Sequence, residues 1–181
     1  DAAGRLAPVA NGGGTERLVY DVDGTLKSRT SDVFSQQISR EGLYNGSISG
    51  ITDMLEGKQS TATYTYDALD RLTGADIMIG GRDRSTTYTY DLNGNITSLT
   101  RMGDDGVDTG RLIDDLSLSY SGNQLTKVTE FADPVFSEAT MNFAKSNNRM
   151  AYKYDSNGNL TSDPYKIATY CWDANNRLLE V

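Results

Sequence analysis

The chain has 181 residues, 37% of them hydrophobic, and a formal net charge of −8, with no histidine and one cysteine. The lack of histidine excludes Ser-His-Asp and Cys-His catalysis and histidine-ligated metals, and a lone cysteine excludes an intrachain disulfide. The acidic balance argues against nucleic-acid binding, which needs a basic patch, and no run of 18 apolar residues is present to span a membrane. We therefore expect no cofactor, no nucleic-acid partner and no membrane span.

Residues 1–17 are interpreted as a linker or an N-terminal edge segment, and residues 18–181 as one repeat domain. The chain starts with Asp1-Ala-Ala-Gly and without an initiator methionine, so we expect a processed or excised piece of a longer protein. Three consecutive glycines at positions 12–14 favour a flexible linker. The first strand is expected near Leu18-Val19-Tyr20.

The sequence pattern that would predict a helix or a strand is weak between residues 40 and 57. Residues 40–49 predict no regular element. The segment Gly50–Gly57 is the best helical candidate in the chain, although it is bounded by glycine at both ends and is barely two turns long. No convincing helix is predicted.

A short motif recurs along the chain: an aromatic residue, an aspartate, turn-forming residues and then an aliphatic residue. The four clear copies occupy Tyr66–Thr73, Tyr90–Thr97, Tyr154–Thr161 and Trp172–Leu179. Two degenerate copies occupy Tyr20–Leu26 and Tyr120–Thr126, and the second of them is one residue short. Because the spacing between copies is irregular, the segments between them are expected to be loops.

Each copy predicts a β-hairpin. Tyrosine and threonine alternate in Thr63–Tyr66 and in Thr86–Tyr90, which places the tyrosines on one face of a strand and the threonines on the other. The turn that follows contains aspartate and asparagine, whose side chains bond their own backbone, and often a glycine that accepts a positive φ. The sequence predicts an all-β fold of roughly twelve short antiparallel strands, arranged as tandem hairpins in one curved sheet strip or a partly closed β-shell.

Two stretches interrupt the repeats. Gly103–Gly110 is rich in aspartate and glycine and predicts a solvated loop. In residues 132–148, Asp133-Pro134 predicts a loop before a possible strand at Ala139–Phe143.

The motif Tyr-Asp-x-x-Gly-Asn, followed by an aliphatic residue and threonine, resembles the YD repeats of RHS proteins, which also occur in teneurins and in the shells of insecticidal toxin complexes. Leu43–Ser49, Leu112–Tyr120 and Gly122–Thr129 are similar in style to RHS-repeat proteins of gut Bacteroidetes, which are bacterial. The resemblance covers residues 20–181. It implies antiparallel hairpins that spiral into a hollow shell, with the repeat aromatics inward, around a toxin or other cargo.

The chain departs from complete cages of that family, which end in a segment with an Asp-Pro-x-Gly motif and often carry an autoproteolytic aspartate. Asp133-Pro134-Val135-Phe136 and Asp163-Pro164-Tyr165-Lys166 lack glycine in the fourth place, and we expect no toxin domain after Val181. Self-cleavage and toxicity are therefore not implied. The resemblance implies a wall segment that is not an enzyme.

The residues expected to define the repeat structurally are Tyr20, Asp21, Tyr66, Asp67, Tyr90, Asp91, Gly94, Asn95, Tyr120, Tyr154, Asp155, Gly158, Asn159, Trp172 and Asp173. Aromatic rings with a polar tip also stack on sugars and peptides, so a second hypothesis is a binding face. Its residues are Tyr64, Tyr66, Tyr88, Tyr90, Tyr152 and Tyr154. The favoured alternative is that these rings and Tyr120 pack against neighbouring hairpins, where cross-strand aromatic pairs stabilise a sheet by about 0.2–1 kcal/mol each.

Other chemistry is weaker, and we predict no catalytic and no metal-ligating residue. The Asp-x-Asn-x-Asn pattern at 91–95 and 155–159 places oxygen ligands as calcium loops do, but it lacks their glycine at place six and glutamate at place twelve. The adjacent acids Asp104-Asp105 and Asp114-Asp115 are expected to be solvated or to point to opposite faces of a strand. Cys171 is expected to be a small buried residue of a strand.

The favoured function is a non-catalytic segment of an RHS/YD-repeat shell from a secreted or cell-surface protein, which encloses or displays a cargo or toxin. The alternative is an extracellular glycan- or peptide-binding module that uses its tyrosine-lined face. Expected partners are the flanking repeats or the cargo of a larger parent. The terminal strands near Leu18–Tyr20 and Arg177–Val181 have exposed edges, so we expect them to be capped, frayed or paired with another copy.

Overall fold

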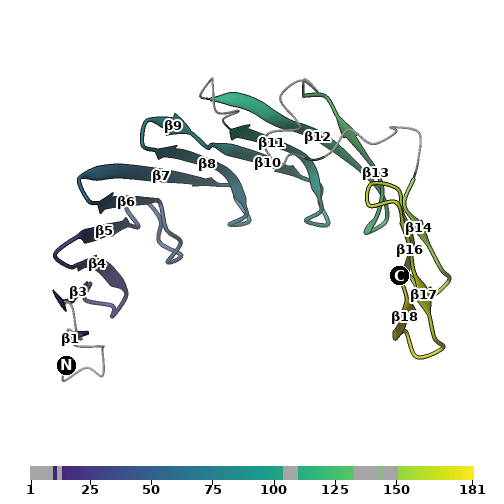
Figure 1. Cartoon of the computed structure of the whole chain (residues 1–181), viewed down its shortest axis with the longest axis horizontal. Helices are drawn as coiled ribbons and strands as arrows, with labels where there is room; N and C mark the ends of the chain where they lie inside the picture. The colour runs from purple at the N-terminus through teal and green to yellow at the C-terminus, as the bar shows by residue number, and fades with distance from the viewer. Residues whose placement is uncertain (1–9, 12–13, 104–109, 133–142, 144–150) are drawn as a thin grey trace. The chain divides into compact units, whose positions relative to one another are not determined.

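The computed structural model describes residues 10–11, 14–103, 110–132, 143 and 151–181. Throughout these ranges every regular element is a β-strand (Figure 1), and no helix is long and apolar enough to cross a membrane. Antiparallel hairpins follow one another along the chain in each of its units. The prediction of an all-β chain of tandem antiparallel hairpins is confirmed. The chain forms two compact units, Asp1–Thr86 and Thr87–Val181.

In the first unit, neighbours along the chain are neighbours in the sheet. Its strands are β1 (Ala10–Asn11), β2 (Gly14–Thr15), β3 (Arg17–Tyr20), β4 (Leu26–Thr30), β5 (Phe34–Ser39), β6 (Gly50–Leu55), β7 (Lys58–Tyr66), β8 (Leu72–Ile79) and β9 (Arg82–Asp83). Strands β1 and β2 pair only with each other, and from β3 to β9 each strand pairs antiparallel with the next. Every second connection therefore falls at the same edge of the sheet.

The second unit has the same kind of arrangement, and its first strand is β10 (Thr86–Tyr90). Its further strands are β11 (Ile96–Gly103), β12 (Arg111–Ser121), β13 (Gln124–Glu130), β14 (Lys153–Tyr154), β15 (Leu160–Asp163), β16 (Ala168–Thr169), β17 (Cys171–Trp172) and β18 (Leu178–Glu180). Strands β10 to β13 are sequential neighbours, β14 to β16 form a three-stranded sheet, and β17 pairs with β18.

The alternation predicted for the strands is confirmed. In β7, Tyr64 and Tyr66 are half-buried while Thr63 and Thr65 are exposed. Strand β10 repeats the pattern with its own tyrosines and threonines. Successive side chains of a strand point to opposite faces, so one face carries aromatic rings and the other carries hydroxyl groups.

Gly50–Gly57, the best but unconvincing helical candidate of the sequence, is a strand and a turn. Residues Glu56 and Gly57 have φ values of 49° and 77°, as the two central residues of a type I′ hairpin turn require. The turn lets β6 pair along its whole length with both β5 and β7. Pairing on both sides outweighs the weak helical tendency of so short a segment.

The expected burial of Cys171 was wrong, although the residue does lie in a strand. Cys171 is exposed, and the adjacent Trp172 is half-buried. Neighbouring residues of a strand face opposite sides, so only one of them can face inward. Burial of the larger tryptophan ring removes more apolar surface from water.

Several expectations fall outside the described residues. They concern residues 104–109 of the predicted aspartate-rich loop, residues 139–142 of the possible strand, and Gly12 and Gly13 of the predicted linker. Gly103 ends β11 and Gly14 lies in β2.

The core of the described residues is small and lies mainly in the second unit. Ile113, Leu116, Val128 and Ala132 are buried there, and Val128 is only 2% exposed. Most strand residues are half-buried because a sheet layer presents both faces. Much of the stability must therefore come from turns, backbone pairing and polar contacts.

Candidate functional site

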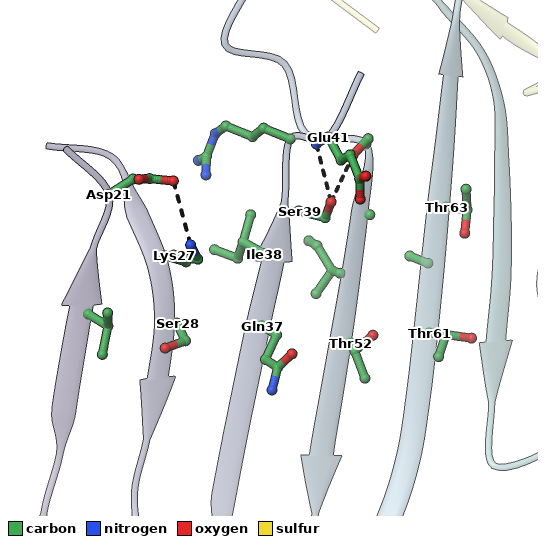
Figure 2. A pocket seen from close by; sticks show the side chains of 16 residues that line it. Asp21, Lys27, Ser28, Gln37, Ile38, Ser39, Glu41, Thr52, Thr61 and Thr63 are labelled. Atoms are coloured by element: carbon green, nitrogen blue, oxygen red, sulfur yellow. Dashed lines mark hydrogen bonds and ion pairs between the residues drawn. The ribbon is translucent and has the colours of Figure 1, made fainter. Parts of the chain in front are cut away.

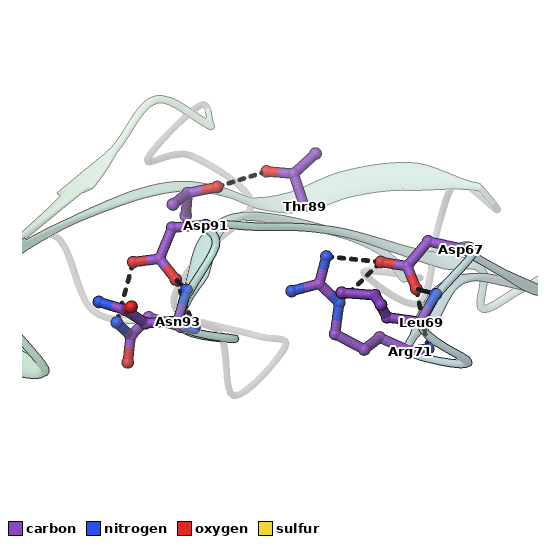
Figure 3. Close-up of polar contacts among 8 residues, drawn as sticks. Asp67, Leu69, Arg71, Thr89, Asp91 and Asn93 are labelled. Carbon is purple, nitrogen blue, oxygen red and sulfur yellow. Dashed lines mark hydrogen bonds and ion pairs between the residues drawn. The ribbon is translucent and has the colours of Figure 1, made fainter.

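The turn after Tyr90 is organised by the carboxylate of Asp91 (Figure 3). Its Oδ1 accepts the backbone N–H groups of Asn93 at 2.8 Å and Asn95 at 2.9 Å, and its Oδ2 accepts the side-chain Nδ2 of Asn95 at 2.9 Å. The Asp91 N–H donates to the Asn95 carbonyl, and the Gly94 N–H donates to the Asp91 carbonyl. One aspartate thus closes the whole turn.

All four clear repeats share this arrangement. In each, the aspartate Oδ1 accepts the N–H groups two and four places later, and Oδ2 accepts the side chain four places later. The Oδ2 donors are Arg71 for Asp67, Asn95 for Asp91, Asn159 for Asp155 and Arg177 for Asp173, at 2.7–2.9 Å. Arginine and asparagine are interchangeable at this place because both present an N–H donor.

The fourth residue of each turn has a positive φ. The value is 88° at both Gly94 and Gly158. Asp70 and Asn176 adopt 60° at the equivalent place. Asparagine and aspartate are the side chains that best tolerate this region, which explains why the motif holds Gly, Asp or Asn there.

The hydrogen bonds lower the pKa values of the turn carboxyls. The Asn95 side chain is the largest cause at Asp91 and the Asn159 side chain at Asp155. At Asp67 and Asp173, the largest cause is the backbone N–H four residues later. Each bond favours the ionised form that accepts it.

We expect the fold to lose stability in acid because of these turns. A carboxyl with a lowered folded-state pKa contributes stability that is full above its unfolded pKa of about 3.9 and is lost as the pH falls through its folded pKa. The melting temperature should therefore fall as the pH is lowered below about 4. A variant with Asp91→Asn and Asp155→Asn has two fewer such groups, so its melting temperature should change less over this range. An equally steep acid loss in this variant contradicts the assignment.

The repeat aromatics connect successive repeats through their polar tips. The Tyr66 hydroxyl donates to the Ile48 carbonyl at 2.8 Å, and the Tyr120 hydroxyl donates to the Ile96 carbonyl at 2.9 Å. The Tyr154 hydroxyl donates to the Leu125 carbonyl at 2.9 Å. Each acceptor is an aliphatic residue that follows an earlier turn. Ile96 and Leu125 follow the turns of the preceding copies, and Ile48 lies in the repeat-like segment Leu43–Ser49.

Trp172, which stands in the tyrosine position, makes the same connection. Its indole Nε1–H donates to the Leu160 carbonyl at 2.8 Å. Tryptophan shares with tyrosine a flat ring with a donor at its far edge, and phenylalanine does not. The repeat therefore requires a donor-tipped aromatic, a rule that four copies obey.

The family assignment follows from this repeat geometry together with the comparisons. Residues 25–181 match the family model described as Teneurin YD-shell, which is most of the chain. The chain belongs to the Teneurin YD-shell family. No curated protein matches it.

Two YD-shell repeats deviate from the full turn. In the first, Asp23 replaces the usual aspartate: its Oδ1 accepts the Thr25 N–H at 2.9 Å and hydroxyl at 2.7 Å, which lowers the pKa of Asp23. In the short copy, Tyr120 pairs with Leu125, and Gly122 has a φ of 61° in a two-residue turn. Both copies still present an aliphatic residue after the turn.

Tyr152, another residue of the predicted binding face, lies in an aromatic cluster of the YD-shell chain. Its ring centroid lies 5.4 Å from that of Tyr165, which in turn lies 4.7 Å from the Phe143 ring. Burial raises the pKa of Tyr152 to about 12. Tyr165 also accepts the Val128 N–H and donates to the Val128 carbonyl.

Sequence reasoning missed a set of buried acids near this cluster. Asp114 is 3% exposed, and its two oxygens accept the Arg101 Nε at 2.5 Å and the Phe143 N–H at 2.6 Å. Glu130 is 4% exposed, and its Oε1 accepts the N–H groups of Asp115 at 2.9 Å and Ala132 at 2.8 Å. Arg101 lies on β11 beside the β12 residue Asp114, and Asp115 lies on β12 beside β13, which carries Glu130. The local sequence therefore holds no signal for these two contacts.

The alternatives of calcium binding and acid–base catalysis gain no support from this geometry. The oxygens of Asp91 and Asp155 accept N–H groups of their own turns. Among the residues that the structure describes, no three acidic or cysteine side chains are grouped to hold a metal. Asp163 of the second Asp-Pro pair accepts the Tyr165 and Lys166 N–H groups, as in a turn.

Neighbouring YD-shell turns are also joined by amide side chains. The Asn45 Nδ2 donates to Asp70 at 2.5 Å, and the Asn95 Nδ2 donates to Asn123 at 3.2 Å. Asn176 accepts Nδ2 groups from both asparagines of the preceding turn, at 2.8 and 3.1 Å. These bonds link neighbouring turns in pairs within each unit.

A groove of about 1160 Å³ lies over strands β3 to β7 of the first unit (Figure 2). Hydroxyl and amide groups line it from Ser28, Gln37, Ser39, Thr52, Thr61 and Thr63. At its rim, Lys27 pairs with Asp21 at 3.9 Å. Its lining includes none of the tyrosines predicted as a binding face.

Proposed function

We propose that this chain is a non-catalytic wall segment of a secreted or cell-surface YD-repeat protein that encloses or displays a cargo such as a toxin. The observation that carries the proposal is the set of bonds from four aromatic tips to backbone carbonyls that follow an earlier turn. In these bonds the hydroxyl and indole N–H groups of the repeat aromatics hold the fold together. The family supports a shell segment and an extracellular or cell-surface setting.

The non-catalytic part of the proposal is supported by the turn carboxylates. In the four clear repeats both aspartate oxygens accept N–H groups of the same turn, and each carboxyl stays ionised at neutral pH. A general acid needs a proton to donate near neutrality, and a nucleophile needs a free oxygen. The aspartate of the motif serves to hold the backbone of its own turn in place.

Flanking repeats of the parent protein are the partners that fit the terminal strands. All three residues of β18 are exposed, and Leu178 and Leu179 are 47% and 68% exposed. An edge strand with apolar side chains pairs readily with another strand. In the parent, the next hairpin would cover this edge.

Size-exclusion chromatography with light scattering, at several concentrations, tests this proposal. A wall segment with exposed edges should associate as concentration rises, and the exposed Leu179→Pro substitution in β18 should weaken the association because proline cannot pair as a strand residue. The matched control is Leu92→Pro, since Leu92 is 100% exposed in a turn. A monomer near 19.7 kDa at every concentration contradicts the proposal.

The second candidate function is an extracellular glycan- or peptide-binding module, which the hydroxyl-lined groove favours. A groove of hydroxyl and amide groups suits a ligand rich in hydrogen-bonding groups. The Tyr66 and Tyr154 hydroxyls are engaged with backbone carbonyls, so the groove is the better candidate surface. Glycan- and peptide-array binding that is lost in Thr52→Val and Thr61→Val, with the fold intact, would favour this function over the first.

A further inference from the structure

The loop between β5 and β6 holds an Asn-Gly pair in an unusual setting. The Asn45 Oδ1 accepts the Ser47 N–H at 2.9 Å, and its Nδ2 donates to the Asp70 carboxylate at 2.5 Å. Gly46 is exposed, has a φ of 84°, and leaves open space where a side chain would be. The side-chain amide is therefore fixed at both ends beside a bare and accessible peptide nitrogen.

This arrangement favours attack of the Gly46 nitrogen on the Asn45 side chain. The Gly46 nitrogen loses its proton to water and bonds to the Asn45 Cγ, the Cγ–Nδ2 bond breaks, and ammonia leaves with a proton from water. Water then opens the five-membered imide at either carbonyl, which leaves aspartate or isoaspartate. The Ser47 N–H donates to the oxygen on which negative charge develops during the attack.

The two other Asn-Gly pairs of the described residues are held differently. In the repeat turns, the nitrogens of Gly94 and Gly158 donate to the Asp91 and Asp155 carbonyls, at 3.2 and 3.1 Å. Attack from either nitrogen requires that this bond break first. Among the described residues, no acceptor is found for the Gly46 N–H.

We propose that Asn45 is a site of spontaneous deamidation in the folded protein, and that the reaction releases the β5–β6 loop from the neighbouring repeat turn. The product carboxylate at position 45 would face the Asp70 carboxylate, to which the amide now donates. Two like charges at this distance repel each other, so the bond becomes a repulsion. The loop also carries Ile48, the acceptor of the Tyr66 tip, so the change reaches the link between repeats.

Peptide mapping by mass spectrometry tests the proposal on the purified chain. The folded chain and the chain unfolded in urea are incubated in parallel at mildly alkaline pH, and deamidation is followed at each Asn-Gly pair. Folding should slow positions 93 and 157 by about fivefold to tenfold, because one hydrogen bond must break. Folding should not slow position 45. Protection of Asn45 as strong as that of Asn93 overturns the proposal.

Two variants test the contributions separately. Ser47→Pro removes the Ser47 N–H, which donates to the Asn45 oxygen that gains negative charge during the attack. This variant should slow deamidation at position 45 in the folded chain and leave the rate in the unfolded chain unchanged. For the consequence, Asn45→Asp should lower the melting temperature, and the further change Asp70→Asn should restore it. A stability of Asn45→Asp equal to that of the native chain overturns the release of the loop.

Discussion

Replacing Glu130 by alanine is expected to lower the free energy of unfolding by about 2–6 kcal/mol. The carboxylate is 4% exposed, and its Oε1 accepts the N–H groups of Asp115 and Ala132. Alanine leaves both donors without an acceptor in a region closed to water, and each such group costs about 1–3 kcal/mol. Urea unfolding followed by circular dichroism measures the loss.

Two further variants show whether the lost acceptor is the cause. Glu130→Gln keeps an oxygen for the two N–H groups, so it should lose clearly less stability than Glu130→Ala. Glu41→Ala removes an exposed carboxylate and should change the unfolding free energy by less than about 0.5 kcal/mol. A loss below that size for Glu130→Ala rules out this role.

Replacing Tyr120 by alanine is expected to lower the unfolding free energy by about 2–4 kcal/mol. Alanine removes the half-buried ring and the hydroxyl that bonds the Ile96 carbonyl. Loss of a fully buried aromatic ring costs about 3–5 kcal/mol, and partial exposure reduces that figure. Thermal and urea unfolding of the purified variant measure it.

Tyr44 is the matched control because its side chain is 103% exposed. Tyr44→Ala should leave stability within about 0.5 kcal/mol of the native chain. Equal losses in the two variants mean that tyrosine content matters in general and that the repeat position does not.

The sequence was sufficient for the hairpins because their determinants are local. Alternation of tyrosine and threonine in Thr86–Tyr90, and the turn residues after it, act within a few positions. The segment Gly50–Gly57 was not readable as a strand because that strand is stabilised by pairing with β5 and β7. A residue's partners on neighbouring strands are not visible in its own segment.

The candidate site was predictable in its residues and less so in its contacts. Sequence reasoning weighed lateral ring packing against a binding face, whereas the structure shows hydrogen bonds from ring tips to carbonyls of the preceding repeat. The signal was present in the replacement of tyrosine by Trp172, which retains a donor. By contrast, the bond from the Asp115 N–H to Glu130 joins β12 to β13 and had no local signature.

The central claim is that the polar tips of the repeat aromatics join successive repeats. The most direct test is the unfolding free energy of a chain with Tyr66, Tyr120 and Tyr154 all changed to phenylalanine, compared with Tyr44→Phe. Each change keeps the ring and removes one hydroxyl, so the triple variant should lose about 2–4 kcal/mol in total and Tyr44→Phe nothing measurable. A triple variant as stable as the native chain would contradict the account.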